Sequence, residues 1–508
     1  MQTNKYLLSL ILITGLLFGA TSCEDFVERH PRDSIADEEA LTSLEGVESA
    51  LTGLYDRLSA GTYNQREMNL AGELLADQMD IAESNAGRMI AHPTNEEGAG
   101  FDLWTRLYDD INRANMILHH VDEIEDAPGQ EVNQIKGETY AFRGHLYFDL
   151  LRVYARPYMY QEPLVAGEPL GVIYKTEPFV GIDERTFEER GTIEEGYNLV
   201  LDDLYRALDY LEGDEGFPYG FNEVSVKANL ARVYLYMGNW SEAADYAEEV
   251  IATADVELVD AEDGIDYIER VFASTPGEES ILEVGFADEA EAPFMNTCVA
   301  GMATYYDEEV FEDKGIEMPH IQTDYEAYGD VILRQDLINL LREYENKGDV
   351  RGMENQTWYQ RDKGGQMCAF QVKYHSHEGV PNWDDYILIR LTEMYFIAAE
   401  AHAEMGDIPA AKDLLMTVRE HRGIGDEEIE ANNTEDFIDL LLTEKRVEFF
   451  SEMSHRWFDL RRRGMDIPKG VEDDDAGTPL DFEDYRVVER IPEAEISANE
   501  NCVQNPGY

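Results

Sequence analysis

The sequence predicts a mainly α-helical protein, in which stacked helix pairs form a scaffold that carries irregular, loop-rich insertions and minor β-structure. Three observations predict this class. Apolar residues recur at helical spacing through long segments. Two segments 168 positions apart repeat one pattern of small and apolar residues, and Gly, Pro and aromatic residues gather between them. With 44% hydrophobic and 11% aromatic residues, the composition is that of a globular protein.

The N-terminal 22 residues predict a secretion signal. Lys5 precedes an apolar run, Leu7–Ala20, which is shorter than the roughly 20 residues that a membrane-spanning helix needs. Small residues then lead directly to Cys23, as in a bacterial lipoprotein signal. We therefore expect residues 1–22 to be removed, Cys23 to carry lipid that anchors the protein, and residues 23–508 to form a single domain. A plain secretion signal with an incidental cysteine is the alternative.

Two segments of the N-terminal half show helical periodicity. Between Ala99 and Val121, apolar residues such as Trp104, Leu107 and Ile111 line one face. Between Glu138 and Tyr154, Tyr147, Leu150, Leu151 and Tyr154 are spaced i, i+3, i+4 and i+7. The stretch from Ser84 to Gly100 lacks such periodicity, so we expect it to be irregular.

The repeated segments predict two helix pairs. Gly238-Asn239-Trp240 and Gly406-Asp407-Ile408 occupy matching positions, each flanked by small and apolar residues at helical spacing. Glycine suits a left-handed helix C-cap, and Pro409 suits the first turn of a following helix. The units resemble tetratricopeptide helix pairs, whose stacking forms a superhelical scaffold.

Between the two pairs, from about 252 to 384, the helical periodicity breaks down. Gly, Pro, Asn and aromatic residues are frequent there, and residues 280–286 predict a short strand. Loops on a rigid scaffold are where binding usually occurs. We therefore expect this insertion to form much of a ligand-binding face.

The segment Glu444–Arg463 is dense in charge and is predicted to be a helix. Glu444, Glu448 and Glu452 recur every four residues and so share a face, and Arg456 follows Glu452 at the spacing of an i,i+4 ion pair. These carboxylates could form a general acid/base set. We favour ion pairs that fix the helix against its neighbours, because opposite charges alternate along the segment.

The charge excludes one class of partner. With 107 acidic and 40 basic residues, the formal net charge is −67, so binding to nucleic acid, which depends on clustered Lys and Arg, is excluded. Only 11 of the basic residues are Lys, and this acidic, lysine-poor composition resembles proteins of salt-loving microbes. Molar salt shortens the Debye length to about 3 Å, which would screen the self-repulsion of such a surface.

Motifs for catalysis and metal binding are absent from the sequence. There is no GxSxG, no HExxH, no phosphate-binding glycine loop and no dinucleotide fingerprint. His375 and His377 lie too close for helical metal ligands, and the acidic run 473–475 lacks the alternation of a calcium loop. We expect no catalytic residue, no metal site and no cofactor, although a structural calcium ion stays open. Cys298 and Cys368 could form a disulfide, which the sequence does not decide.

Several segments together resemble the SusD/RagB family of surface nutrient-binding lipoproteins. Each is weak alone, but their order and number cover nearly the whole mature chain. They are Cys23-Glu24-Asp25, Trp104–Tyr108 with Ile111, Asn112 and Asn115, Arg143–Leu150, Ile389–Tyr395 with Ala399–Ala401, Glu444–Arg463, Ile491-Pro492 with Glu495-Ile496, and Gln504–Tyr508.

The resemblance implies a helical lipoprotein that performs no chemistry. Such a protein sits on the outer membrane, facing the cell exterior, over a TonB-dependent β-barrel transporter of the SusC type. It binds oligosaccharides or peptides and presents them to that transporter for nutrient uptake. The ligand loops of this family vary, so the resemblance transfers no binding residue.

The candidate ligand-binding residues come from general chemistry. Sugar rings pack on aromatic side chains, while their hydroxyls need amide and charged partners. For each aromatic ring, ordinary packing is the alternative. Two other functions stay open, namely a lipid-anchored glycoside hydrolase and an assembly scaffold without ligand. The candidates in the irregular stretches are Asn85, Arg88, Phe294, Asn296, Tyr305 and Tyr306.

Overall fold

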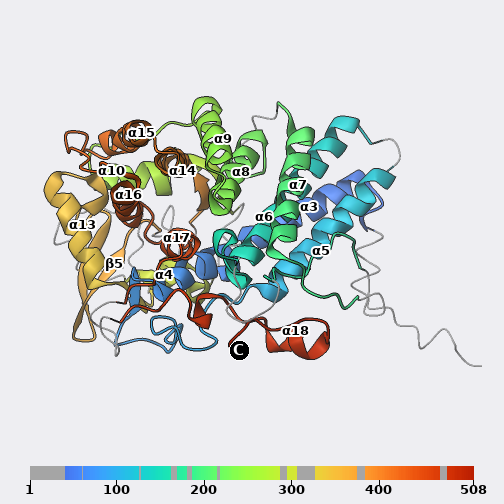
Figure 1. Ribbon diagram of the computed structural model, residues 1–508, viewed down its shortest axis with the longest axis horizontal. Coiled ribbons are helices and arrows are strands. Elements are labelled where there is room, and N and C mark those ends of the chain that lie inside the picture. The colour runs from blue at the N-terminus through green and yellow to red at the C-terminus, as the bar shows by residue number, and fades with distance from the viewer. Residues whose placement is uncertain are drawn as a thin grey trace, which may run out of the picture.

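The structure is a computed structural model. It describes residues 40–59, 61–124, 127–161, 169–179, 186–213, 218–286, 294–305, 327–374, 384–469 and 478–508. Helices dominate these residues, which confirms the predicted class (Figure 1). Cys23 and the predicted signal peptide lie outside the described residues.

The N-terminal half is built around one long helix, α6 (Gly129–Tyr154), which packs against both α5 and α7 (Figure 1). From Ala141 to Tyr154 every residue of α6 is buried, as a central helix requires. Gly137 lets α7 approach, because a Cβ there would lie 2.5 Å from Leu211 Cγ. The other described helices that precede residue 212 are α3 (Leu44–Ser59), η1 (Gly61–Ala71), α4 (Gly72–Leu75), α5 (Trp104–His120), η2 (Val121–Glu123), η3 (Tyr158–Tyr160) and α7 (Ile193–Leu211).

The predicted helix pairs are confirmed as α8 (Glu223–Met237) with α9 (Trp240–Thr253), and α14 (Leu391–Glu404) with α15 (Ile408–His421). Gly238 and Gly406 both take left-handed conformations, with φ of 73° and 85°. Matching backbone hydrogen bonds, Asn239 N to Tyr234 O and Asp407 N to His402 O, close the two caps. The pairs stack, because α14 packs against both α9 and α8.

The remaining described elements surround these pairs. The insertion predicted to be loop-rich contains the expected strand, and also helices and a hairpin. The described helices of the insertion are α10 (Gly264–Ile268), η5 (Glu269–Ala273), η7 (Met295–Thr297), α11 (Val299–Ala303), α13 (Gln335–Lys347) and η8 (Val350–Gly352). The described helices that follow α15 are α16 (Thr434–Glu448), α17 (His455–Arg462), η10 (Tyr485–Val487) and α18 (Glu493–Ala498). The described strands of the insertion are β2 (Ser280–Val284), β3 (Val331–Leu333), β4 (Trp358–Lys363) and β5 (Gln366–Gln371), and those outside it are β1 (Met79–Ile81) and β6 (Tyr386–Arg390).

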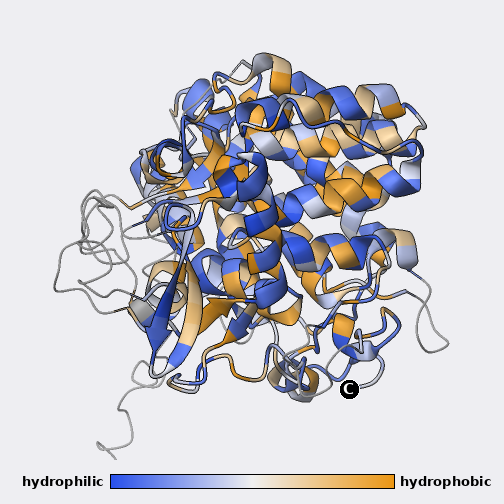
Figure 2. Cartoon of the chain, turned by 90° about the vertical axis from the view of Figure 1, so that its left-hand side faces the viewer, coloured by the Kyte–Doolittle hydropathy of each residue, from blue (hydrophilic) through white to orange (hydrophobic). Residues whose placement is uncertain are grey.

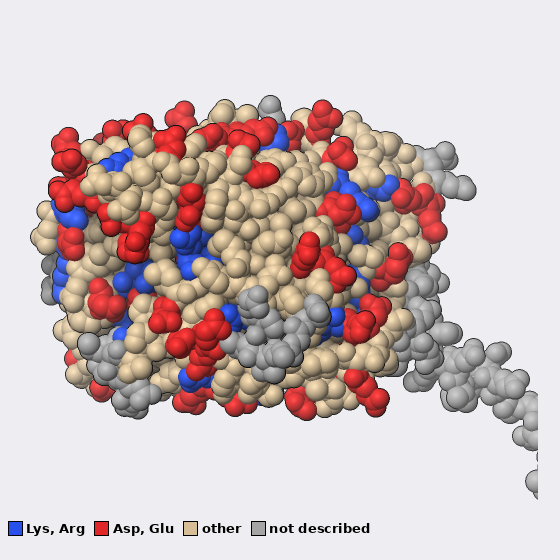
Figure 3. All heavy atoms as spheres, in the orientation of Figure 1, with Lys and Arg blue, Asp and Glu red and all other residues tan. Residues whose placement is uncertain are grey.

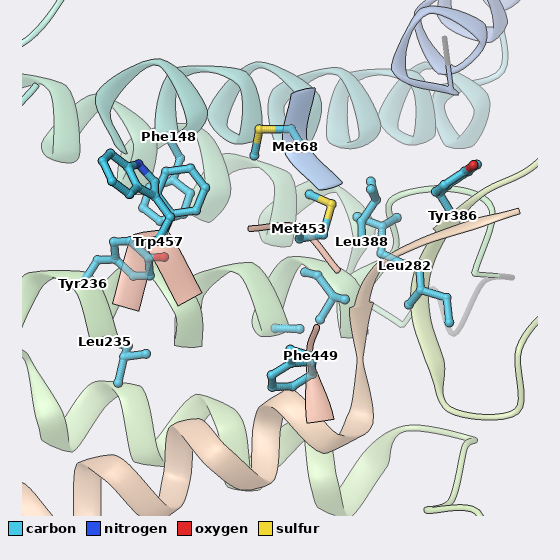
Figure 4. Packing of buried hydrophobic residues seen from close by; sticks show 14 of the residues in the cluster. Met68, Phe148, Leu235, Tyr236, Leu282, Tyr386, Leu388, Phe449, Met453 and Trp457 are labelled. Carbon is cyan, nitrogen blue, oxygen red and sulfur yellow. The ribbon is translucent and has the colours of Figure 1, made fainter. Parts of the chain in front are cut away.

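The strands form three two-stranded antiparallel sheets, β1 with β3, β2 with β6, and β4 with β5. Along the helices, apolar residues alternate with polar ones (Figure 2). One continuous apolar core results. Within it Trp457, 1% exposed, lies beside Phe148 and Tyr236, whose ring centroids are 5.1 Å apart (Figure 4).

The prediction of one helix over Glu444–Arg463 is wrong. The chain leaves α16 after Glu448 and re-enters a helix at His455, and Ser451, Met453 and Ser454 between them have positive φ. Distant residues hold this turn. Ser451 N donates to Glu73 Oε2 at 3.2 Å, and Met453 N donates to Asn69 Oδ1 at 2.7 Å. Because of the break, Arg456 pairs with Asp77 instead of Glu452.

Ion pairs nevertheless fix this segment, as predicted. Glu448 receives hydrogen bonds from the guanidinium groups of Arg351, Arg390 and Arg422. Around it, five acidic and five basic residues, each at most 5% exposed, form a buried ion-pair network that joins α16 to β6, η8, α15 and the residue before β2. Its members are Glu279, Asp349, Glu444, Glu448, Glu452, Arg351, Lys373, Arg390, Arg419 and Arg422.

The three described cysteines are buried thiols, namely Cys298, Cys368 and Cys502. Cys298 and Cys368 therefore do not form the disulfide that the sequence left open. No helix within the described ranges is both long and apolar enough to span a membrane.

Candidate functional site

The candidate site begins where two short strands bring distant loops together. β1 pairs with β3 from Met79↔Leu333 to Ile81↔Val331. One more backbone hydrogen bond, from Ala82 N to Asp330 O at 2.9 Å, extends this pairing. The loop that leaves β1 and the segment that enters β3 therefore start side by side.

The β4–β5 hairpin holds the first of these loops in place. Gly364 and Gly365 at its tip have φ of 64° and 95°, the left-handed pair that a tight two-residue turn requires. Lys363, on one side of the turn, donates a hydrogen bond from Nζ to Ser84 O. On the other side, Gln366 Oε1 accepts a hydrogen bond from Glu83 N at 2.8 Å.

Asp330 is the electrostatic centre of this region. The residue is only 2% exposed. Arg88 Nη1 donates to its Oδ2 at 2.7 Å, and Lys363 Nζ lies 3.6 Å from its Oδ1. One buried carboxylate thus serves as counter-ion to two cations that come from different loops, which fixes the loops relative to each other.

The outward side of the region offers a ring, a guanidinium and an amide. The Arg88 guanidinium carbon lies 3.8 Å from the centroid of the Tyr328 ring, which is 36% exposed. Such stacking contributes about 0.5–1 kcal/mol at an exposed site and orients both groups. Asn85 is exposed, and its side chain closes a local turn by accepting from Gly87 N at 2.7 Å.

Tyr305 forms the base of the region. Its backbone N donates to the Tyr359 hydroxyl at 2.9 Å, and that hydroxyl donates to Tyr305 O at 2.8 Å. The half-buried Tyr305 ring lies 5.7 Å from the Phe370 ring and 5.9 Å from Lys363 Nζ, measured from its centroid. This ring therefore combines a packing role with a position at the site. We call the whole arrangement the loop corner, consisting of Asn85, Arg88, Tyr305, Tyr328, Asp330, Lys363 and Gln366.

The structure gathers some of the predicted site residues and separates others. Asn85, Arg88 and Tyr305 meet in the loop corner. Phe294, 83% exposed, and the exposed Asn296 precede α11, whereas Tyr305 follows it. Tyr306 lies outside the described residues.

Sequence reasoning missed four members of the loop corner, Tyr328, Asp330, Lys363 and Gln366. The first two flank Gly329 within the stretch predicted to form the ligand face. The frequent glycine and aromatic residues of that stretch were the signal that could have identified them. The last two flank Gly364-Gly365, a dipeptide typical of a hairpin turn. Only the pairing of the strands shows that these residues approach Arg88.

The loop corner is suited to non-covalent binding of a hydroxyl-rich ligand. The exposed Tyr328 ring and the half-buried Arg88 guanidinium stacked on it provide a flat surface, and the guanidinium and the Asn85 amide provide hydrogen-bond groups. Its buried carboxylate is engaged by Arg88. Across the part of the chain that the structure describes, no group of three or more His, Cys, Asp or Glu residues could hold a metal ion.

Two family models match the chain. A model described as the SusD family matches residues 294–508, and a model described as starch-binding and associating with the outer membrane matches residues 25–235. Both descriptions agree with the resemblance that the sequence motifs carry. The two matched ranges contain all members of the loop corner.

Curated relatives match along most of their length. SusD-like protein P38 of Formosa agariphila is 26% identical over 485 residues, which cover 89% of this chain and 90% of the relative. A SusD-like protein of Bacteroides ovatus is 24% identical over 500 residues, which cover 90% of this chain and 82% of the relative.

Solved structures share the fold. A SusD superfamily protein of Bacteroides vulgatus superposes with a TM-score of 0.75 at 24% identity, covering 92% of this chain and 99% of that one. A laminarin-binding SusD-like protein superposes with a TM-score of 0.66 at 21% identity, covering 91% and 99%. At these identities the likeness shows the fold alone.

Proposed function

Because the chain belongs to the SusD family, we propose that it captures glycan fragments at the cell surface and delivers them to a TonB-dependent outer-membrane transporter. The observation that carries this proposal is the loop corner, where Arg88 stacks on Tyr328 and Asn85 lies exposed three residues before Arg88. A ring with flanking hydrogen-bond groups fits a pyranose. Two similar proteins are described as a sugar-binding protein and a laminarin-binding protein, which supports a glycan over a peptide.

The binding proposal is tested by calorimetric titration of starch and laminarin oligosaccharides into the purified mature protein. We expect saturable binding without hydrolysis, because the corner offers binding groups and its buried carboxylate is paired. Arg88→Ala and Tyr328→Ala should each weaken affinity at least tenfold, which corresponds to about 1.4 kcal/mol. Arg156→Ala is the matched control, since Arg156 also stacks on a ring, Phe482, and pairs with a carboxylate, that of Glu483.

Three results would contradict this proposal. Equal affinity of Arg88→Ala and Arg156→Ala would remove the loop corner as the site. Release of shortened sugars that persists in the Arg88→Ala protein would favour a hydrolase. Binding of peptides, but of none of these glycans, would change the ligand class.

We further propose that lipid on Cys23 holds the protein at the outer face of the outer membrane, where it covers the transporter. The lipoprotein-type signal and the family description of association with the outer membrane support this location. Cys23→Ala should move the protein from the membrane fraction to the soluble fraction, as judged by immunoblot.

In high salt, the wild-type protein purified from detergent-solubilised outer membrane should bring with it a TonB-dependent β-barrel, identified by mass spectrometry. Retention of Cys23→Ala in the membrane, or absence of any β-barrel, would contradict the anchor or the partner respectively.

A further inference from the structure

A second hollow lies on the helical half of the molecule. A groove of about 540 Å³ opens between α5, α6 and α7 and the segment 176–178. Its volume lies within the range of about 300–1,000 Å³ that small-molecule sites occupy. α5 and α7 lie on the opposite side of the molecule from β5, which carries part of the loop corner (Figure 1). We call this hollow the helix groove.

The floor of the helix groove is rigid. Arg143, 4% exposed, donates from Nε and Nη2 to both carboxylate oxygens of Asp203, at 2.8 and 2.7 Å. Its Nη1 donates to Asn115 Oδ1 at 2.8 Å, and Asn115 Nδ2 donates in turn to Lys175 O at 3.0 Å. A doubly hydrogen-bonded guanidinium of this kind gives the floor a fixed shape.

One wall is an oriented aromatic ring with a half-exposed cation. The Tyr140 ring lies parallel to the Tyr210 ring, with 1° between their planes, and the guanidinium carbons of Arg143 and Arg206 each lie 5.4 Å from the Tyr140 centroid. Arg206 is 51% exposed and forms an ion pair with Asp202 at 2.9 Å. Its hydrogen-bonding groups are therefore accessible from the groove and already positioned. The Arg206 side chain would lose little conformational freedom when a ligand binds.

The charges of the lining select the class of ligand. The ion pairs at the groove are Asp122 with Lys136, Asp202 with Arg206 and Asp203 with Arg143, so Glu177 is the lining carboxylate that lies outside these pairs. Among its described residues the groove therefore has no excess of Lys or Arg over carboxylates that would attract uronates, sulfates or phosphates. A neutral sugar fits, because its hydroxyls donate to carboxylates and accept from a guanidinium.

We propose that the helix groove is a second saccharide site, which holds a neutral sugar unit independently of the loop corner. This inference rests on the proposed glycan-binding function and adds a position that the loop-based site does not include. Two sites on opposite sides of the molecule would let one protein hold a branched or long glycan at two points.

The test uses laminarin oligosaccharides and the purified mature protein in which the loop corner is disabled by Arg88→Ala and Tyr328→Ala. We expect this protein to retain one saturable site. Adding Arg206→Ala should weaken that residual binding at least tenfold. Adding Arg113→Ala should not, although Arg113 forms the same kind of exposed i,i+4 ion pair, with Asp109 on α5. Calorimetric stoichiometry should be two for the wild type and one for Arg206→Ala, and thermal unfolding of each variant confirms that it folds.

The outcomes separate this inference from the proposed function. A wild-type protein that binds one equivalent, all of it lost with the loop corner, overturns the second site alone. Residual binding that survives Arg206→Ala, or a groove that takes a basic peptide in place of the sugar, also overturns it. A wild-type protein that binds no glycan at all overturns both proposals.

Discussion

At the scale of single residues, buried glutamates divide into two kinds. Burial raises the pKa of Glu73 to about 8, and the hydrogen bond from Ser451 N offsets only part of this effect. Burial acts on Glu448 in the same direction, but the guanidiniums of Arg422, Arg390 and Arg351 outweigh it and hold the pKa of Glu448 well below its usual value. Neighbouring cations, rather than burial, therefore decide which carboxyl is ionised.

Glu73 gives a pH-dependent prediction. An unfolded glutamate titrates near 4.5, so between that pH and about 8 the folded protein retains a proton that the unfolded chain has lost. The free energy of unfolding contributed by this group falls by about 1.4 kcal/mol per pH unit over that window, and falls no further above it. Glu73→Gln, which is neutral at every pH, should therefore lose less stability than the wild type between pH 5 and 8 in urea titrations.

The exposed Glu428 provides the control for this experiment. Glu428→Gln should leave the pH dependence of unfolding as it is in the wild type. Parallel pH profiles of Glu73→Gln and the wild type would show that Glu73 does not titrate in the folded protein as we expect.

At the scale of elements, local sequence patterns predicted several helices, but not α3, α7 or α13, nor the break between α16 and α17. Periodicity located α5, α6 and both helix pairs, because each has an apolar face or a glycine cap that its own sequence specifies. The turn between α16 and α17 is fixed by Glu73, Asn69 and Met68, which lie between 378 and 386 positions away in the sequence. Such a contact leaves no trace in a local pattern.

A close approach at this turn gives a second prediction. A Cβ on Gly72 would lie 2.3 Å from Ser454 Cβ and 2.9 Å from Trp457 Cβ, so α4 would have to move away from α17. Gly72→Ala should lower the free energy of unfolding by about 1–3 kcal/mol, the usual range for overpacking. Chemical denaturation measures the effect.

Gly53 in α3 is the matched control, because a Cβ there meets nothing within 4 Å. Gly53→Ala should stabilise the protein by about 0.5–1 kcal/mol through reduced backbone entropy of the unfolded chain. If Gly72→Ala and Gly53→Ala changed the free energy of unfolding by the same amount, the packing of α4 against α17 would not be tight enough to exclude a Cβ at Gly72.

The loop corner shows the same limit on prediction from sequence. Residue chemistry selected Asn85, Arg88 and Tyr305. The partner Asp330 is brought in by the pairing of β1 with β3, strands of three residues that are too short to show alternation, and Lys363 comes from the β4–β5 hairpin. Candidate residues were thus partly identifiable, whereas their grouping required the structure.

At the scale of the whole molecule, charge is divided between interior and surface. The buried ion-pair network balances five acidic against five basic side chains, so it contributes nothing to the formal net charge of −67. The excess of acidic residues therefore lies outside it. Figure 3 shows many acidic side chains and fewer basic ones over one face of the molecule.

This division predicts how salt acts on stability. Raising NaCl from about 20 mM to 1 M shortens the Debye length to about 3 Å and should raise the melting temperature by several degrees, because it screens repulsion between surface carboxylates. Sucrose at equal osmolality is the control for general solute effects. A melting temperature that is unchanged by NaCl, or that rises equally in sucrose, would contradict a stabilising role for charge screening.

The buried ion-pair network also constrains how this chain could diverge from its relatives. Loss of one member would strand an opposite charge in the interior, at a cost of about 3–5 kcal/mol, a large share of the 5–15 kcal/mol that keeps a typical domain folded. Mutational drift should therefore spare these ten positions or exchange them in compensating pairs, while solvent-facing acids change singly.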